Sequence, residues 1–171
     1  MRYWITATLF LLGALIYAAN HLGFFAPSFA AIRGTEIETI ALKDLNGDSK
    51  AFSQLYGDET VIYFFASWCA PCYHSLSEIE SVRNSHQLSI RFLAVALDDD
   101  VEAVKNMVHK VNYTGETWIA SSQVLQQRKF GNERRAIPYT IKLNKHNEII
   151  ESKYRIKKPQ WSEILVNGTA L

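Results

Sequence analysis

An unbroken apolar run that leads into a pair of cysteines constrains the fold of this chain more than any other feature. Residues 61–66 (Val-Ile-Tyr-Phe-Phe-Ala) carry no charge and are rich in β-branched and aromatic side chains, which is typical of a strand buried on both faces. Residues 73–82 then place apolar side chains at helical spacing. The sequence therefore predicts a strand that passes into a helix, with Cys69 and Cys72 at the junction.

The cysteine pair itself suggests redox chemistry. Cys69 and Cys72 are the only cysteines of the chain, and two residues separate them. Two thiols at this spacing can close into a disulfide and reopen while the fold persists. Unpaired N–H groups and the macrodipole at a helix N-terminus stabilise a thiolate there. The pattern predicts a redox-active dithiol.

Two other interpretations of the pair are a structural staple and half of a zinc site. A disulfide between near neighbours closes a tiny loop and removes little conformational entropy from the unfolded chain. A structural zinc ion needs four ligands, usually with a second Cys or His pair. His74 lies close to the cysteines, but the other histidines show no such pairing. The redox interpretation is therefore favoured over both.

The N-terminal part of the chain has a composition of its own. Arg2 is the only charged residue in residues 1–32, and residues 3–19 form a 17-residue uncharged stretch. This length is near the lower limit for a membrane-spanning helix and exceeds most signal-peptide cores. We expect an uncleaved membrane anchor, with a signal segment cleaved after Ala30 as the alternative. A single cation before the span favours a cytoplasmic N-terminus, which would place a domain of residues 33–171 in the periplasm or otherwise outside the cytoplasm.

Charge and cysteine content narrow the function classes. Without Arg2 the chain has 17 basic and 17 acidic residues, and such a balance offers no electrostatic footprint for nucleic acid. One dithiol outside the cytoplasm, without structural cysteines, suits an enzyme that acts on the disulfides of other proteins. We expect no nucleic-acid partner, no metal and no cofactor beyond the Cys69–Cys72 disulfide.

The rest of the chain alternates short strands with helices. The expected strands are residues 36–42, 61–66, 90–97, 117–120, 139–143 and 148–154. The expected helices are residues 52–56, 69–82, 101–111 and 124–130, and a last one opened by Pro159. Asn46-Gly47 is typical of a tight hairpin turn. This order predicts an α/β fold, a sheet with helices on both faces.

Two separated motifs resemble the thioredoxin superfamily. They are residues 65–72 (Phe-Ala-Ser-Trp-Cys-Ala-Pro-Cys) and residues 136–140 (Ala-Ile-Pro-Tyr-Thr). Residues 98–122 look like the helix–strand insertion that separates the TlpA/ResA/DsbE-type proteins from plain thioredoxin, and the opening hairpin and N-terminal membrane segment also look like that type. The resemblance spans residues 37–165. It implies a thioredoxin-like fold, with a central mixed sheet flanked by helices, the insertion and a preceding membrane segment.

The resemblance also implies roles for the site residues. Cys69 would be the attacking thiolate and Cys72 the buried resolving thiol. Pro138 would be a cis-proline packed against the dithiol, whereas the alternative is an ordinary strand-initiating proline. The backbone of Ile137 would pair with an extended substrate peptide. Trp68 would cover the dithiol, and the alternative is a simple core tryptophan.

Two positions depart from the pattern of the superfamily. Thioredoxins carry a buried carboxylate six residues before the first cysteine, where this chain has Tyr63. TlpA/ResA-type proteins often carry a glutamate three residues after the second cysteine, where this chain has Ser75. Both usual proton-handling carboxylates are thus replaced. Glu78, one helical turn beyond Ser75, could relay protons through water, although a solvated helix glutamate is the favoured interpretation.

The direction of electron flow follows from the residues around the cysteines. Ala70 and Pro71 provide no histidine of the kind that stabilises the thiolate in strong oxidants, and Ile137 resembles the reducing members. The resemblance therefore implies a thiol-disulfide oxidoreductase of the bacterial envelope. It would reduce disulfides in exported proteins with electrons from a membrane thiol reductant.

Three alternative functions are a cytochrome c maturation thioredoxin, a thiol peroxidase and a copper-binding module. Nothing in the sequence separates cytochrome c maturation from general reduction. The residues before Cys69 lack the Pro-x-x-x-Thr-x-x-Cys pattern of a peroxidase. Copper-delivering relatives use a wider cysteine spacing and a distal histidine, a pattern that is not evident here, although soft thiolates do suit Cu(I).

Overall fold

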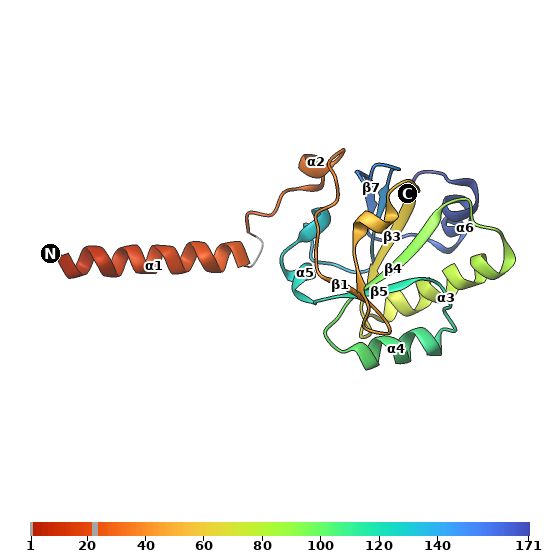
Figure 1. The fold of residues 1–171 in the computed structure, drawn as a ribbon, viewed down its shortest axis with the longest axis horizontal. Coiled ribbons are helices and arrows are strands. Elements are labelled where there is room, and N and C mark those ends of the chain that lie inside the picture. The colour runs from red at the N-terminus through yellow and green to blue at the C-terminus, as the bar shows by residue number, and fades with distance from the viewer. Residues whose placement is uncertain (1, 22–23) are drawn as a thin grey trace.

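The structure is a computed structural model that describes residues 2–21 and 24–171. The elements, in chain order, are α1 (Arg2–His21), α2 (Phe29–Ile32), β1 (Leu42–Asp44), β2 (Ser49–Lys50), the 3-10 helix η1 (Phe52–Leu55), β3 (Thr60–Phe65), α3 (Ala70–Ser85), β4 (Arg91–Leu97), α4 (Val101–Lys110), β5 (Thr117–Ala120), α5 (Gln123–Gln126), the 3-10 helix η2 (Lys129–Gly131), β6 (Tyr139–Leu143), β7 (Ile149–Lys153) and α6 (Lys158–Asn167). Helix α1 extends away from the other elements, which gather around one sheet (Figure 1).

A mixed sheet forms the centre of the domain. Its seven strands lie in the order β2-β1-β5-β4-β3-β6-β7. Strand β3 pairs in parallel with β4 and antiparallel with β6, and β4 pairs in parallel with β5. The α/β fold with a mixed central sheet is thereby confirmed, and α4 and β5 lie within residues 98–122, where the helix–strand insertion is expected.

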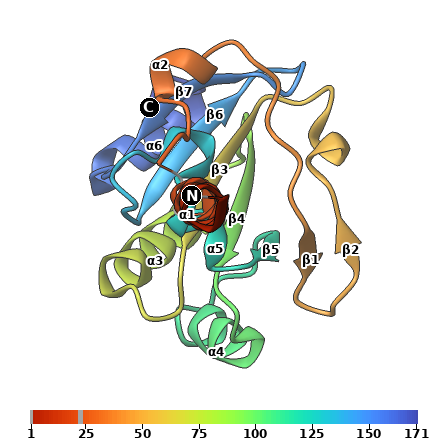
Figure 2. The same ribbon diagram turned by 90° about the vertical axis from the view of Figure 1, so that its left-hand side faces the viewer.

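Helices and loops cover both faces of the sheet. Val61, Tyr63 and Phe65 of β3 pack into one cluster with α3, α4 and α6. Ile62 and Phe64 pack into a second cluster with η1, α5 and η2. Successive side chains of a strand point to opposite faces, so a strand covered on both sides reads as a continuous apolar run. Figure 2 shows α3 and α6 side by side on the first face.

The strand expected over residues 36–42 is wrong in its extent. Only Leu42 belongs to a strand, β1, and the preceding chain makes a single isolated bridge, between Glu36 and Glu148. Ile37 is nevertheless buried in the second cluster. Thr39 and Ala41, which share the alternation with Ile37, are exposed, so the sequence pattern here predicts neither the strand nor its buried face.

The helix expected over residues 124–130 is also broken. It is divided into α5 and η2, because Arg128 and Phe130 adopt positive φ angles of 55° and 58°. Gly131 follows at φ 70°, and a Cβ there would lie 2.8 Å from the Cα of Phe29. The close approach of α2 therefore requires glycine at this position.

The other expected strands and helices are confirmed, with small shifts at their ends. The hairpin turn at Asn46-Gly47 joins β1 to β2, and Gly47 has a φ of 94°. The Asp44 carboxylate accepts hydrogen bonds from the N–H groups of Asn46 and Asp48, at 2.9 and 3.0 Å. Such a local side-chain contact stabilises a tight turn.

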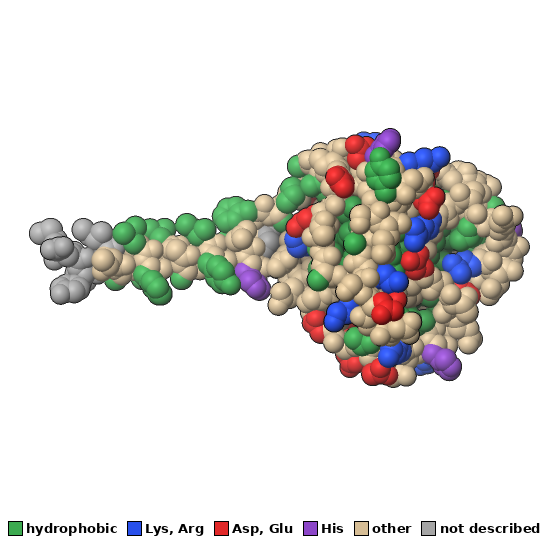
Figure 3. Space-filling view, in the orientation of Figure 1, with side chains coloured by type: hydrophobic (Ala, Val, Ile, Leu, Met, Phe, Trp, Pro, Cys, Tyr) green, Lys and Arg blue, Asp and Glu red, His purple; other side chains and the backbone are tan. Residues whose placement is uncertain are grey.

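The N-terminal residues divide into an extended helix and a segment that contacts the domain. Apolar side chains of α1 such as Leu9 and Phe10 are exposed (Figure 3). In the described part of the chain, no helix combines the length and the apolarity needed to cross a membrane, so the structure does not show the spanning helix expected over residues 1–32. Helix α2 packs against η2, and the Phe29 N–H donates to the Glu133 carboxylate at 3.0 Å.

Candidate active site

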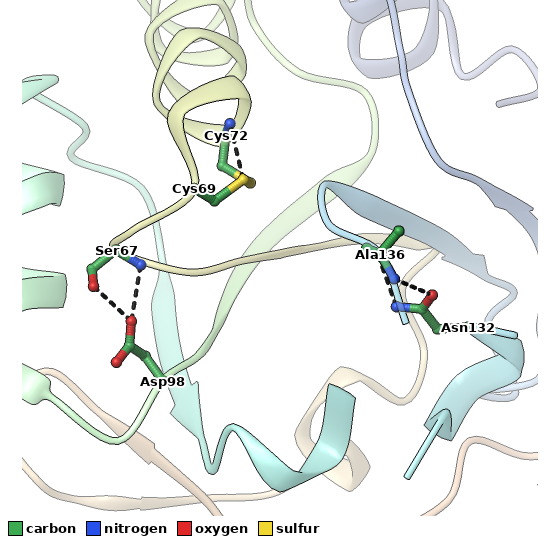
Figure 4. Close-up of a disulfide and its surroundings, with 6 residues drawn as sticks. All are labelled: Ser67, Cys69, Cys72, Asp98, Asn132 and Ala136. Atoms are coloured by element: carbon green, nitrogen blue, oxygen red, sulfur yellow. Dashed lines mark hydrogen bonds between the residues drawn. A yellow bond between two sulfur atoms is a disulfide. The ribbon is translucent and has the colours of Figure 1, made fainter. Parts of the chain in front are cut away.

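The two cysteines lie where several loops converge at the carboxyl ends of the central strands β3 and β4. Strands β3 and β4 run in parallel, so both end on this side of the sheet. Strand β6 runs antiparallel to β3, with Tyr139 opposite Phe64, and therefore starts there. The loops that follow β3 and β4 therefore meet the loop that precedes β6 (Figure 4). Crevices at the carboxyl ends of parallel strands are common ligand sites in α/β folds.

Cys69 and Cys72 form a disulfide at the start of α3, and their Cα atoms are 5.2 Å apart. Cys69 is the N-cap of the helix, and its Sγ accepts a hydrogen bond from the Cys72 N–H at 3.3 Å. Cys69 is 5 % exposed, whereas Cys72 is fully buried. A sulfur that accepts an N–H hydrogen bond at a helix N-terminus is suited to be the thiolate. This geometry is compatible with the roles that the resemblance implies, Cys69 as the attacking sulfur and Cys72 as the resolving one.

A buried carboxylate holds the segment that leads into the cysteines. Asp98 directly follows β4, and its Oδ2 accepts hydrogen bonds from the Ser67 N–H at 2.9 Å and the Ser67 hydroxyl at 2.7 Å. Its Oδ1 accepts a third from the Asp100 N–H at 3.0 Å. Asp98 is 8 % exposed. It is a positioning residue, because it acts on the dithiol through the backbone of Ser67.

Replacement of this carboxylate is expected to destabilise the fold. Asp98→Ala leaves the donors of Ser67 and Asp100 without their acceptor, so the free energy of unfolding should fall by about 2–3 kcal/mol. Urea unfolding of the oxidised protein measures this loss. The control is Asp58→Ala, because the Asp58 side chain is 64 % exposed and its ion pair with Arg91 is long, at 3.8 Å. This substitution should change the free energy of unfolding by less than about 0.5 kcal/mol. Equal losses in the two variants would contradict the role of Asp98.

A second side chain closes the loop on the other side of the disulfide. Asn132, which is buried, donates from Nδ2 to the Ala136 carbonyl at 2.9 Å and accepts at Oδ1 from the Ala136 N–H at 3.1 Å. The loop leads into Ile137 and Pro138, whose peptide bond is cis, as the resemblance implies. Figure 4 shows this pair and the Ser67–Asp98 pair on opposite sides of the cysteines.

Trp68 lies at the surface beside Cys69. Its side chain is 66 % exposed, so the alternative of a core tryptophan is wrong. Together with Tyr73 and Lys110 it borders a shallow depression next to Cys69. An exposed indole beside a reactive sulfur offers apolar contact area to a partner.

Tyr63 occupies the position of the thioredoxin carboxylate and is fully enclosed. It is 1 % exposed, its ring contacts Phe92 and Trp161, and its hydroxyl lies near the Ser75 side chain. Burial raises the pKa of Tyr63, so the phenol keeps its proton at neutral pH. Tyr63 therefore cannot replace the carboxylate as a proton acceptor.

A groove of about 710 Å³ opens beside the dithiol. The start of α3 lines it with Ala70, Pro71 and Glu78, and Pro138 faces them from the loop before β6. Glu78 is the only carboxylate among the described lining residues. The structure thus brings Glu78 to the same groove as the cis-proline.

The structure brings the site residues predicted from the sequence together at the carboxyl ends of β3 and β4. They are Trp68, Cys69, Pro71, Cys72, Glu78, Ile137 and Pro138. The sequence analysis missed Asp98 and Asn132. Asp98 directly follows a predicted buried strand, a position where polar side chains often serve a site, so its place could have drawn attention. Asn132 carries no comparable signal.

Comparisons with known proteins agree with this geometry. The sequence profile of the Redoxin family matches residues 26–164. The chain is 22% identical over 153 residues to the thiol-disulfide oxidoreductase ResA of Halalkalibacterium halodurans, over 88% of this chain and 85% of the relative.

Solved structures share the fold at low sequence identity. StoA from Bacillus subtilis has a TM-score of 0.56 and 22% identity, covering 74% of this chain and 95% of that chain. A thiol:disulfide interchange protein of the thioredoxin family from Chlorobium tepidum TLS has a TM-score of 0.61 and 18% identity, covering 77% of this chain and 94% of that chain. A secreted Mycobacterium tuberculosis disulfide oxidoreductase homologous to E. coli DsbE has a TM-score of 0.56 and 16% identity, covering 72% of this chain and 91% of that chain.

Proposed function

Because this chain belongs to the Redoxin family, we propose that it is a thiol-disulfide oxidoreductase that reduces disulfides in exported proteins. The observation that carries the proposal is the Cys69–Cys72 disulfide at the start of α3, where Cys69 is 5 % exposed and Cys72 is fully buried. The similarity to ResA supports the same reaction class.

The reduced enzyme transfers two electrons in two exchange steps. The Cys69 thiolate attacks one sulfur of a substrate disulfide, a new S–S bond forms, and the other substrate sulfur leaves as a thiolate that takes up a proton. Cys72 then loses its proton and attacks the Cys69 sulfur, which releases the second substrate thiolate and closes the enzyme disulfide. The proton released by Cys72 passes to solvent. A membrane dithiol returns two electrons and two protons to the enzyme.

The proposed direction of transfer is supported by the few groups that would stabilise a Cys69 thiolate. Within the described structure, the Cys69 sulfur accepts one hydrogen bond, from the N–H of Cys72. Ala70 and Pro71, which separate the cysteines, add no side-chain donor. A thiolate without strong stabilisation makes the reduced form a good electron donor, and this supports the reductase over the oxidase.

The proposed place of action is outside the cytoplasm. Residues 1–32 would deliver the domain there, either as a retained anchor or as a segment that is cleaved. Support comes from the uncharged stretch of residues 3–19 and from the structural neighbour described as secreted. The identity of the proteins trapped by Cys72→Ser, exported or cytoplasmic, tests this location.

The reduction potential of the Cys69–Cys72 couple tests the reductase directly. We expect a value near about −270 mV, as for thioredoxin, when the full-length chain is equilibrated with dithiothreitol buffers and its free thiols are alkylated and counted by mass. A Cys69→Ser/Cys72→Ser variant controls for alkylation elsewhere. A value near about −120 mV, as for DsbA, would make the protein an oxidant and overturn the proposed direction.

A further inference from the structure

We propose that the groove beside the dithiol selects substrate disulfides that are flanked by acidic residues. This specificity rests on the proposed reductase function and names the substrate class of the same site. The groove, called the basic groove below, is bounded by α3, by Pro138 and by Arg155, Lys157 and Lys158. A polypeptide that lies along Pro138 with its disulfide at Cys69 would therefore pass these three cations.

The charges of the three cations of the basic groove are not paired with a carboxylate of the described residues. Arg155, Lys157 and Lys158 are exposed and form no ion pair within the described structure. Six other basic side chains do pair with a carboxylate, as Lys50 does with Asp44 at 3.1 Å. Unpaired cations that flank a reactive site remain available for an anionic group of a partner.

The charge of the basic groove differs from that of the whole chain. Three cations face one carboxylate, that of Glu78, whereas the chain as a whole carries a net charge of only +1. The positive potential is thus concentrated beside the dithiol, where it can steer a charged partner. Figure 3 shows basic and acidic side chains interspersed over the visible face of the domain.

The backbone adds to this potential. Helices α3 and α6 both begin at the basic groove, since Ala70 and Lys158 are their first residues and both line it. The N-terminal end of a helix carries a partial positive charge. An acidic side chain next to the substrate cysteine would therefore meet cationic side chains and positive helix ends together. The occupant that fits is an extended polypeptide with Asp or Glu near its disulfide.

Binding of unreactive peptides tests this preference without requiring turnover. Three labelled peptides differ only in the residues that flank the cysteine positions, which are Asp, Asn or Lys, and serine replaces each cysteine. Fluorescence anisotropy with the oxidised full-length chain is expected to show the Asp peptide binding about tenfold more tightly than the Asn peptide at low salt, and the Lys peptide most weakly. The preference should shrink at 1 M salt, because screening shortens the range of the interaction.

A matched pair of variants assigns the preference to the basic groove. Lys157→Gln/Lys158→Gln should reduce the tenfold preference for the Asp peptide over the Asn peptide to about threefold or less. The control Lys43→Gln/Lys145→Gln removes the same charge from exposed lysines outside the groove, in β1 and in the turn between β6 and β7, and should leave the preference unchanged.

The outcomes separate the specificity from the reaction. Equal binding of the three peptides, binding of none, or an equal loss in the control variant would overturn the acidic preference. Reduction of a disulfide-bonded Asn peptide by the dithiol enzyme is measured in parallel. If that peptide is not reduced, the proposed function fails, while the order of the three binding constants still decides the preference.

Discussion

Cys72→Ser is expected to accumulate as mixed disulfides with its protein substrates, whereas Cys69→Ser accumulates in none. The first exchange step needs only the Cys69 thiolate, and release of the substrate needs the attack by Cys72. Removal of Cys72 therefore stops the reaction after the first step. Removal of Cys69 leaves a sulfur that is fully buried and cannot reach a protein disulfide.

The trapped species are measured in cells that express each full-length variant. Acid quenching and alkylation preserve the mixed disulfides, non-reducing electrophoresis separates them, and mass spectrometry identifies the bound proteins. The Cys69→Ser/Cys72→Ser variant sets the background. Equal trapping by the two single variants would show that the assigned roles of the two cysteines are wrong.

Trp161→Ala is expected to lower the free energy of unfolding by about 3–5 kcal/mol. Trp161 of α6 is 0% exposed and packs against the rings of Tyr63 and Phe92, with centroid distances of 5.7 and 6.1 Å. The substitution removes a large buried side chain and leaves a cavity between α6 and the sheet, which surrounding residues fill only in part. Urea unfolding followed by circular dichroism measures the change.

The matched control is the same substitution at the exposed tryptophan. Trp68 is 66% exposed, so Trp68→Ala should change the free energy of unfolding by less than about 0.5 kcal/mol. The two variants differ in burial and not in the chemistry of the substitution. If Trp161→Ala cost no more than Trp68→Ala, α6 would not be packed on the sheet as described.

The sequence by itself determined the central strand, the helix that follows it and the position of the cysteines between them. These features are local, because a strand buried on both faces reads as a continuous apolar run and a helix shows its period within a few turns. The same local signals were insufficient for residues 36–42, where a buried Ile37 lies in extended chain outside the strands. They were also insufficient at Phe130, where a positive φ breaks the expected helix.

Only the tertiary structure decided what surrounds the dithiol. Asp98 and Ser67 are 31 residues apart, and they meet because β3 and β4 are parallel neighbours in the sheet. Lys157 reaches the same groove as Pro138 because the segment before α6 returns to the start of α3. Such contacts depend on strand order and helix packing, which no local pattern of the sequence encodes. The sequence thus determines the cysteine pair, and the fold determines the carboxylate that holds the segment before it and the cations that line the groove beside it.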